Sequence, residues 1–442
     1  MTRCSTGAIS TRSSFVGELP TAAVQYPTVY SSLGVVPSRM RDLKRAETKS
    51  AILEAAWRRY ASIGPDGTSV REVASDAGCN HALIARYFCS KDGLVAAVLR
   101  RLEQGVDAAA DEALASGGDP VFELLQTARD DRSCVQLLVR SGLGDLGDTG
   151  CPAARHAMRI LSATQPGVGP GKRAALRSRL CTYGAASLVL GWLTYEDFVA
   201  AAVRIGAVSG RRRDLAIAAA AHRVMSVAPA TGPSLTGGLQ VNRSLVGGGD
   251  PVPTSAQSAL VDAAVELFAL RGPASVSVRD VGRHAGVNQG LIYRHFGSKQ
   301  ALLAAAFEQG SSGLFPAALA PEGFDIDTVI HQVHHGSRAP WLIARILVDD
   351  VDIAQVRKQF PILRRLLGAY EGVPTGGRSP DVADPRIAVA SVTCMAMGSA
   401  VYGHDLLAAL DLPDDGSIEV AISDLCRILL AEPRVASGAG GS

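Results

Sequence analysis

The side chains best placed to do chemistry lie in residues 272–303, GPASVSVRDVGRHAGVNQGLIYRHFGSKQALL. Gln289 and the run Tyr-Arg-His at 293–295 would share the polar side of one helix, away from its apolar stripe. Amide, phenol, guanidinium and imidazole groups can hydrogen-bond to base edges in a major groove and to the phosphates beside it. The chemistry that this pattern predicts is non-covalent recognition of a nucleic acid.

Two short helices must position these groups. Ser277 can cap a first helix, Gly286 then breaks the chain, and Asn288 can cap a second helix. In that second helix Ile292 and Phe296 lie four residues apart and so share one apolar face. Two short helices joined by a tight glycine-containing turn are typical of a helix-turn-helix. The second helix would enter the groove, and the segment Gly-Ser-Lys that follows would start a third helix whose N-terminus attracts a phosphate.

The segment GVNQGLIYRHFGSKQALL resembles the DNA-binding signature of the tetracycline-repressor (TetR) family. The matching features are the turn glycine, the core LIYRHF of the recognition helix and the SK that follows it. The resemblance covers a whole amino-terminal DNA-binding domain, from Ser255 to about Phe307. It implies an all-α fold in which further helices form a ligand pocket and a dimerisation face. A helical hairpin that only packs is the alternative, but it does not explain why Tyr293, Arg294 and His295 gather on the polar side.

The motif occurs twice. Residues 64–95, GPDGTSVREVASDAGCNHALIARYFCSKDGLV, align with 272–303 at an offset of 272 − 64 = 208. No gap is needed from Ser50 to Leu99, and roughly two in five positions are identical in this window. The sequence therefore predicts two TetR-like units in tandem, each with a helix-turn-helix domain and a helical ligand or dimerisation domain.

The first copy departs from the family pattern. Ala85 stands where the family has its usual aromatic residue, and His81 replaces Gln289 at the position most exposed to bases. The remaining differences are Ala82 for Gly290, Tyr87 for His295 and Cys89 for Gly297, whereas Arg86, Phe88, Ser90 and Lys91 are kept. The fold should survive, because Ile84 and Phe88 preserve the apolar stripe. The two units should prefer different half-sites.

The residues expected to contact DNA follow from these alignments. In the first unit they are Arg45, Ser69, Arg71, Asn80, His81, Ala82, Arg86, Tyr87 and Lys91. In the second unit they are Ser277, Arg279, Asn288, Gln289, Gly290, Tyr293, Arg294, His295 and Lys299. A basic arm that touches phosphate or the minor groove is also predicted, although a solvated helix start would look the same; its residues are Arg39, Arg41, Lys44, Arg45 and Lys49.

Composition limits the class of protein. The 442 residues carry a net charge of +2, and residues 1–230 hold 28 basic against 21 acidic residues, a net charge of +7. The remainder therefore carries +2 − 7 = −5, so a polyanion is favoured at the first unit. No uninterrupted apolar run reaches the roughly 18 residues of a membrane span. Eight cysteines without a CxxC pair suggest reduced thiols in a cytoplasmic protein.

The predicted organisation alternates domains with linkers. It comprises a disordered extension at 1–40, DNA-binding domain 1 at 41–103, regulatory domain 1 at 104–227, a flexible linker at 228–254, DNA-binding domain 2 at 255–309, regulatory domain 2 at 310–432 and a disordered tail at 433–442. Periodicity predicts helices outside the two motifs at 94–115, 120–128, 132–140, 152–163, 172–203, 212–227, 301–311, 325–335, 339–349, 352–368, 384–410 and 416–431.

Other clusters are weaker signals. His331, His334 and His335 lie at i, i+3 and i+4, a spacing that could gather imidazoles around a metal ion. No carboxylate or cysteine near them in the sequence completes a ligand set, so a polar pocket wall or a solvated face is favoured and neither a metal nor a cofactor is predicted. The candidate pocket residues, several of which would equally suit a core, are Trp192, Tyr195, His335, Trp341, Tyr402 and His404.

These features predict a ligand-responsive repressor that reads an asymmetric palindrome in double-stranded DNA. Its effector would be a small molecule, and its two units would pair within one chain rather than as a homodimer. One alternative is a regulator that acts constitutively. Another is a protein-interaction module in which the degenerate first unit only supplies a dimer partner. An enzyme has no support, because the sequence contains no GxSxG, Walker, dinucleotide or HExxH motif.

Overall fold

The computed structural model describes residues 38–146, 151–164, 171–226, 255–312, 326–352, 363–364, 366–368, 384–414 and 416–430. Every regular element in these ranges is a helix, which confirms the all-α prediction. The predicted linker at 228–254 and tail at 433–442 lie outside the described residues, as does most of the predicted extension at 1–40. The first helix begins at Ser38, so it replaces the last residues of that extension.

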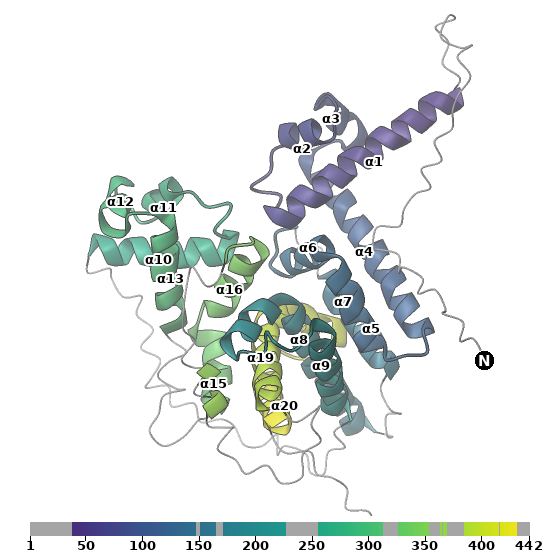
Figure 1. Ribbon diagram of the computed structural model, residues 1–442, viewed down its shortest axis with the longest axis vertical. Helices are drawn as coiled ribbons and strands as arrows, with labels where there is room; N and C mark the ends of the chain where they lie inside the picture. The colour runs from purple at the N-terminus through teal and green to yellow at the C-terminus, as the bar shows by residue number, and fades with distance from the viewer. Residues whose placement is uncertain are drawn as a thin grey trace, which may run out of the picture.

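The first half of the chain contains nine helices in the ranges described. They are α1 (Ser38–Ser62), α2 (Val70–Asp76), α3 (Ala82–Phe88), α4 (Lys91–Ala115), α5 (Pro120–Asp130), α6 (Arg132–Gly142), α7 (Pro152–Thr164), α8 (Lys172–Ala202) and α9 (Gly210–Met225). We call α1 to α3 with the start of α4 the first head. The residues of the predicted basic arm belong to α1, which Figure 1 shows projecting beyond α2 and α3. The side chains of Arg39 and Arg41 are not among those described.

The second half repeats this order. Its described helices are α10 (Ala256–Arg271), α11 (Val278–His284), α12 (Gly290–Phe296), α13 (Lys299–Ser312), α15 (Ile326–His331), η3 (Gln332–Gly336), α16 (Ala339–Val348), α19 (Pro385–Leu410) and α20 (Ser417–Leu430). We call α10 to α13 the second head. The single helix predicted at 325–335 is instead an α-helix that continues as the π-helix η3. Most of the helix predicted at 352–368 lies outside the described residues.

Local sequence signals set many of these helix boundaries. Asp119 and Asp384 cap α5 and α19 with their carboxylates, and each is followed by a proline at the first helical position. The predicted helix at 94–115 begins three residues earlier, at Lys91, and the helix predicted at 352–368 is not tested because most of it lies outside the described residues. The remaining predicted helices of the regulatory regions begin and end within about two residues of their observed positions.

The core of the molecule lies where helices of the two halves meet. Figure 1 shows α8, α9, α19 and α20 gathered below the two heads, and α8 packs along α19. Two glycines allow this contact: a Cβ at Gly191 would lie 1.9 Å from the carbonyl oxygen of Cys394, and one at Gly398 would lie 2.0 Å from that of Ser187. The two helices therefore approach backbone to backbone.

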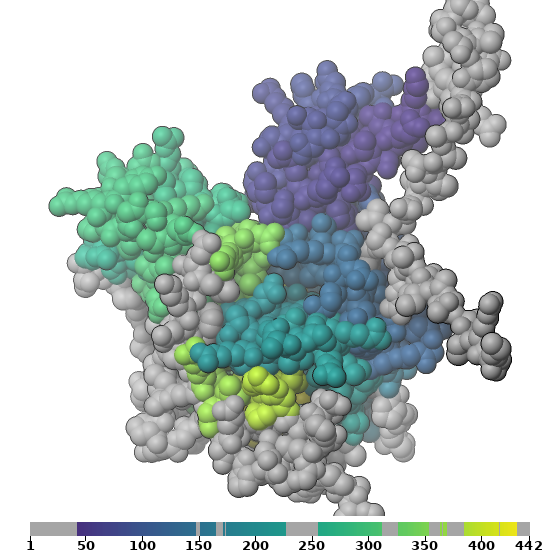
Figure 2. All heavy atoms as spheres, viewed as in Figure 1, coloured from purple at the N-terminus to yellow at the C-terminus, as the bar shows by residue number. Residues whose placement is uncertain are grey.

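Polar contacts cross the same surface. The buried hydroxyls of Thr194 and Tyr402 lie 2.6 Å apart, one from each half. Among the described helices, α19 is long and apolar enough in composition to cross a membrane, but 83% of its most apolar window is buried inside the protein. It is therefore the central helix of a protein core. Figure 2 shows the two heads as separate lobes at the upper end of the molecule.

The close approach at Gly398 generates a stability prediction. Gly398→Ala should lower the free energy of unfolding by about 1–3 kcal/mol, because the new methyl group overlaps the backbone of α8. This loss should appear despite the roughly 1 kcal/mol by which alanine favours a helix over glycine. Urea unfolding followed by circular dichroism measures it. The matched control is Gly206→Ala, where a Cβ meets nothing within 4 Å, and equal stability of the two variants would contradict the argument.

Candidate nucleic-acid interface

The second head contains a helix-turn-helix built from its own sequence signals. The Ser277 side chain accepts from the Asp280 amide at 3.2 Å, and the Asp280 carboxylate accepts from the Ser277 amide at 2.9 Å. This capping box starts α11. Gly286 then takes φ +67°, a left-handed conformation that glycine adopts at no steric cost. The turn is closed by the Val287 amide, which donates to the Gly282 carbonyl at 2.9 Å.

The recognition helix α12 exposes the side chains that the sequence singled out. Ile292 is buried against the head, whereas Tyr293 is 57% exposed. The other exposed residues of this face are Gln289, Gly290, Arg294 and His295. Gln289 is oriented by Arg279, whose Nε donates to its Oε1 at 3.2 Å. The helix thus offers an amide at its N-terminus and a phenol, a guanidinium and an imidazole along its length, the donors and acceptors that base edges and phosphates require.

The predicted cap at the start of α12 is shifted by one residue. The N-cap position is Gln289, which makes no side-chain cap hydrogen bond. Asn288 nevertheless satisfies a free amide, because its Oδ1 accepts from the Gly290 amide at 2.8 Å. Asn80 does the same for Ala82 in the first head, also at 2.8 Å. Both asparagines therefore hold the turn and direct the helix start.

The first head has the same backbone. Ser69 and Glu72 form a capping box, Gly78 takes φ +63°, and the Cys79 amide donates to the Ala74 carbonyl at 2.9 Å. The side chains of α3 differ from those of α12. The exposed residues of this face are His81, Ala82, Ala85 and Arg86, together with Arg71 from α2.

Several residues expected to contact DNA also have partners inside the protein. Tyr87 is half-buried, with the Arg45 guanidinium 5.7 Å from its ring centroid. The hydroxyls of Ser69 and Ser277 serve as helix caps. Lys299 is half-buried, and its ammonium donates to the carbonyl of Pro273. Because of this burial, the pKa of Lys299 is lowered. Lys299 thereby braces the second head, a role that its sequence neighbours do not predict; its counterpart Lys91 is also half-buried.

Two arginines that the sequence analysis missed attach the heads to the body. Arg140 in α6 is 1% exposed; its Nε donates to the Ala61 carbonyl at 2.9 Å and its Nη2 to the Ser62 carbonyl at 2.8 Å. The same Nη2 lies 2.7 Å from Oδ1 of Asp349 in the second half. Arg140 therefore satisfies the free carbonyls at the end of α1 while it pairs with a carboxylate of the opposite half.

Arg345 in α16 repeats the arrangement. It is 2% exposed, and its Nη2 donates to the Leu270 carbonyl at 2.6 Å and to the Leu143 carbonyl at 3.0 Å. Its Nη1 pairs with Asp145 of the first half. We call Arg140, Arg345, Asp145 and Asp349 the arginine clasp. The signal that could have revealed it is an arginine within an apolar helical run, as in WLIARILV, since a buried charge needs a partner.

The Asp349 carboxylate is buried with Arg140, whereas Asp145 is partly buried. Burial raises the pKa of Asp349, opposed by the charge of Arg140 and by the Ala274 amide, which donates to its Oδ2 at 2.7 Å. Ala274 lies in the turn that follows α10. The clasp therefore reaches the second head by two routes, through the end of α10 and through this turn.

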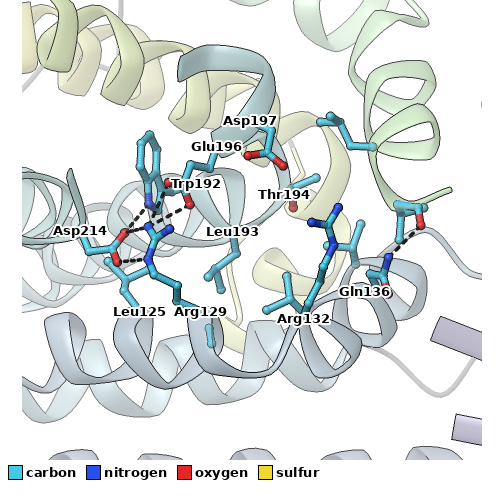
Figure 3. A pocket seen from close by; sticks show the side chains of 15 residues that line it. Leu125, Arg129, Arg132, Gln136, Trp192, Leu193, Thr194, Glu196, Asp197 and Asp214 are labelled. Carbon is cyan, nitrogen blue, oxygen red and sulfur yellow. Dashed lines mark hydrogen bonds and ion pairs between the residues drawn. The ribbon is translucent and has the colours of Figure 1, made fainter. Parts of the chain in front are cut away.

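Two cavities lie near these contacts. The first, of about 200 Å³, is lined by residues of α5, α6, α8 and α9 together with Leu347 and Val348. Figure 3 shows Arg129 in it between Asp214 and Glu196, while Nε1 of Trp192 donates to the Asp214 carboxylate at 2.9 Å. The hydrogen bond to Asp214 raises the pKa of Arg129, and burial raises that of Glu196. This cavity is polar and charged on one wall.

The second cavity, of about 500 Å³, adjoins the second head. Its walls include His335, Trp341 and Arg345, and the end of α10 at Leu270. A molecule bound there would therefore touch both the arginine clasp and the second head.

The structure sorts the predicted pocket residues into three groups. Trp192 lines the first cavity, and His335 and Trp341 line the second. Tyr195 and Tyr402 lie outside both: they are buried between the halves, where the Tyr195 hydroxyl donates to the Pro340 carbonyl at 2.9 Å. His404 lies on the surface. The assignment of Tyr195 and Tyr402 to a pocket is therefore corrected, because side chains that fill a contact between helices leave no space for a ligand. His404 is exposed and lines neither of the two cavities.

Comparison with known proteins agrees with the geometry. The family model for bacterial regulatory proteins of the tetR family matches residues 52–98 and 260–306, two segments separated by the same offset of 208. An HTH-type transcriptional repressor, Rv3405c of Mycobacterium tuberculosis, is 29% identical over 166 residues, which cover 38% of this chain and 83% of that protein. The HTH-type transcriptional regulator Mb3439c of Mycobacterium bovis matches with the same identity and coverage.

The residue that follows the recognition helix differs between the two heads, and this difference yields a stability prediction. Cys89 has φ +67°, where the second head has Gly297 at φ +76°. Cys89→Gly should raise the free energy of unfolding by up to about 1 kcal/mol, since a side chain in this region costs roughly 1–2 kcal/mol and glycine returns part of that gain through its entropy. Thermal unfolding measures the change. Cys89→Ala is the control, because it removes the thiol but keeps the Cβ; stabilisation of both variants alike would show that backbone strain is not the cause.

Proposed function

Since this chain is a tetR-family DNA-binding regulator with two tetR-type units, we propose that it is a ligand-responsive repressor that reads one asymmetric operator with its two heads. The observation that carries this proposal is the pair of exposed recognition faces on one chain. One presents His81, Ala82 and Ala85, and the other presents an amide, a glycine and a phenol at the equivalent positions. Different side chains at equivalent positions select different bases.

Pairing of the two units within one chain is the second part of the proposal. The contact between α8 and α19, made by Gly191 and Gly398, supports it, as does the arginine clasp, in which each arginine uses a carboxylate of the other half. A covalent tether also raises the effective concentration of one half near the other to the millimolar range, so an intramolecular pair has an advantage over an intermolecular one.

Repression and response to a ligand are the remaining parts of the proposed function. The relative from M. tuberculosis is named a repressor, which favours the same sign of regulation here. The 500 Å³ cavity favours ligand response because its wall includes Arg345 and Leu270, which connect the body to the second head. A small molecule that prefers one position of this head would shift the population of DNA-competent molecules.

The base preferences of single variants test whether each head reads its own half-site. His81→Ala and Gln289→Ala should each relax base preference in one half-site only, and Tyr293→Ala should weaken binding to all sequences alike. Selection from random DNA, followed by electrophoretic shifts at fixed salt, measures this for each variant. The selected operator should contain two unlike half-sites about one helical turn, or a multiple, apart. A perfect palindrome, or base preference unchanged in both variants, would refute the proposal.

A mass measurement tests the pairing. Light scattering of the free protein at low micromolar concentration should give a mass near the 45.9 kDa of one chain, because each half already covers the other's α8 or α19 surface. A mass of twice that value would mean that like units pair between chains, with four heads in each assembly. An electrophoretic shift with the DNA upstream of the protein's own gene tests the interaction-module alternative. That alternative expects a folded protein that does not specifically retard this DNA.

A further inference from the structure

We propose that the second half holds a site for one divalent transition-metal ion of the zinc, cobalt and nickel class, ligated by His331, His335 and Glu419. This site goes beyond the proposed function and does not depend on it. Nδ1 of His331 lies 3.1 Å from Oε2 of Glu419, and Nε2 of His335 lies 2.5 Å from Oε1. One ligand atom from each residue can be chosen so that the three lie within 4.8 Å of one another. Two imidazoles and one carboxylate are a donor set that such ions prefer.

The fold supplies the ligand that the sequence lacked. His331 ends α15 and His335 lies in η3, and their ring centroids are 5.0 Å apart. Glu419 comes from the first turn of α20, 84 residues beyond His335. The sequence alone predicts no metal here, because no carboxylate or cysteine is near the three histidines in the chain. Packing of α15 and η3 against α20 brings that carboxylate to them.

His334 is not one of the ligands. Its Nδ1 is 2.8 Å from the Ile330 carbonyl, and its Nε2 is 3.0 Å from the Ser399 hydroxyl of α19. Both ring nitrogens are therefore engaged in fixing η3 against the core. These two contacts hold the backbone of η3 that presents His335.

An ion would fit after a rearrangement of the three side chains, because their ligand atoms are now spread over distances of up to 4.8 Å. Bonds of about 2.0–2.1 Å in a tetrahedral site place neighbouring ligand atoms roughly 3.3 Å apart. The separation of 3.1 Å at His331 is close to this value, whereas the 2.5 Å at His335 must lengthen by somewhat less than 1 Å. The His335 side chain is 59% exposed, so it is free to move outward and leaves the fourth position open to water.

The equivalent contact in the first half has different chemistry. There α5 packs against α9, and Arg129 reaches from α5 to Asp214 and Glu196. A guanidinium occupies the space between the carboxylates and would repel a metal ion. Within the described residues, the group of His331, His335 and Glu419 is the one set of three potential ligands that meets at one point. The two halves share a backbone plan here but differ in what they can bind.

One ligand of the site also lines the 500 Å³ cavity. His335 contributes to both, and Trp341 and Arg345 line the same cavity. An ion at the site would fasten η3 to α20 and fix this wall. Through His335 the metal site adjoins the cavity that Arg345 of the arginine clasp also lines.

The experiment is a titration of full-length protein, freed of metal with a chelator, with Co²⁺ and then Zn²⁺ against a chromophoric competitor. We expect one ion per chain and a cobalt spectrum of nitrogen and oxygen ligands. His331→Ala, His335→Ala and Glu419→Gln should each weaken binding by more than the roughly 10- to 100-fold that loss of an outer-shell partner costs. The matched control is His222→Gln in the first half, because His222 also pairs with a carboxylate, Asp119, at 2.8 Å but has no second imidazole in its group; its affinity should not change.

Three results would overturn the proposal. They are unchanged affinity in the three variants, absence of binding by the wild type, and a thiolate charge-transfer band, which would place the ion at exposed thiols such as Cys89. Circular dichroism and melting temperatures show whether each variant is folded. If a variant is not, nuclear magnetic resonance of the wild-type imidazoles decides: addition of Zn²⁺ should shift the ring signals of His331 and His335 together, and unchanged signals of both rings would reject the site.

Discussion

The arrangement of the two heads depends on the burial of two guanidinium groups. A buried arginine is tolerated only when its charge is paired and its donors are satisfied. Arg140 and Arg345 meet that requirement with the carbonyls that end α1 and α10 and with carboxylates of the opposite half. Loss of one partner in such a network costs about 3–5 kcal/mol. The first helix of each head is consequently attached to the body at its C-terminus, and α6 and α16 cannot shift without moving or releasing a head.

The clasp exists because α8 and α19 hold the halves together beneath it. At Gly191 and Gly398 the two helices meet backbone to backbone, and the hydroxyls of Thr194 and Tyr402 pair across the same contact. Close packing of this kind has few alternative arrangements, because a shift of one helix along the other would bring side chains into the space that glycine leaves. The contact thereby sets the positions from which Asp145 and Asp349 reach the opposite arginines.

The two halves show how one backbone plan carries different chemistry. Both heads use a serine capping box, a left-handed glycine and an asparagine at the turn, yet the exposed side chains on their recognition helices differ. Below the heads, the first half fills the contact between α5 and α9 with Arg129, whereas the second half places two histidines and Glu419 at the corresponding contact. Backbone signals constrain a few positions, so the remaining side chains are free to diverge.

The sequence by itself determined the helix-turn-helix in both copies, the all-α fold and most helix boundaries, because caps, turn glycines and apolar periodicity act between residues close in the chain. It also identified the exposed face of α12, since amphipathic spacing decides which side of a short helix is buried. Only the tertiary structure decided that Tyr402 belongs to a core, that Lys299 is anchored at Pro273, that Arg345 joins the halves and that Glu419 meets His335. These contacts join residues far apart in the chain, where local spacing carries no information about which side chains become neighbours.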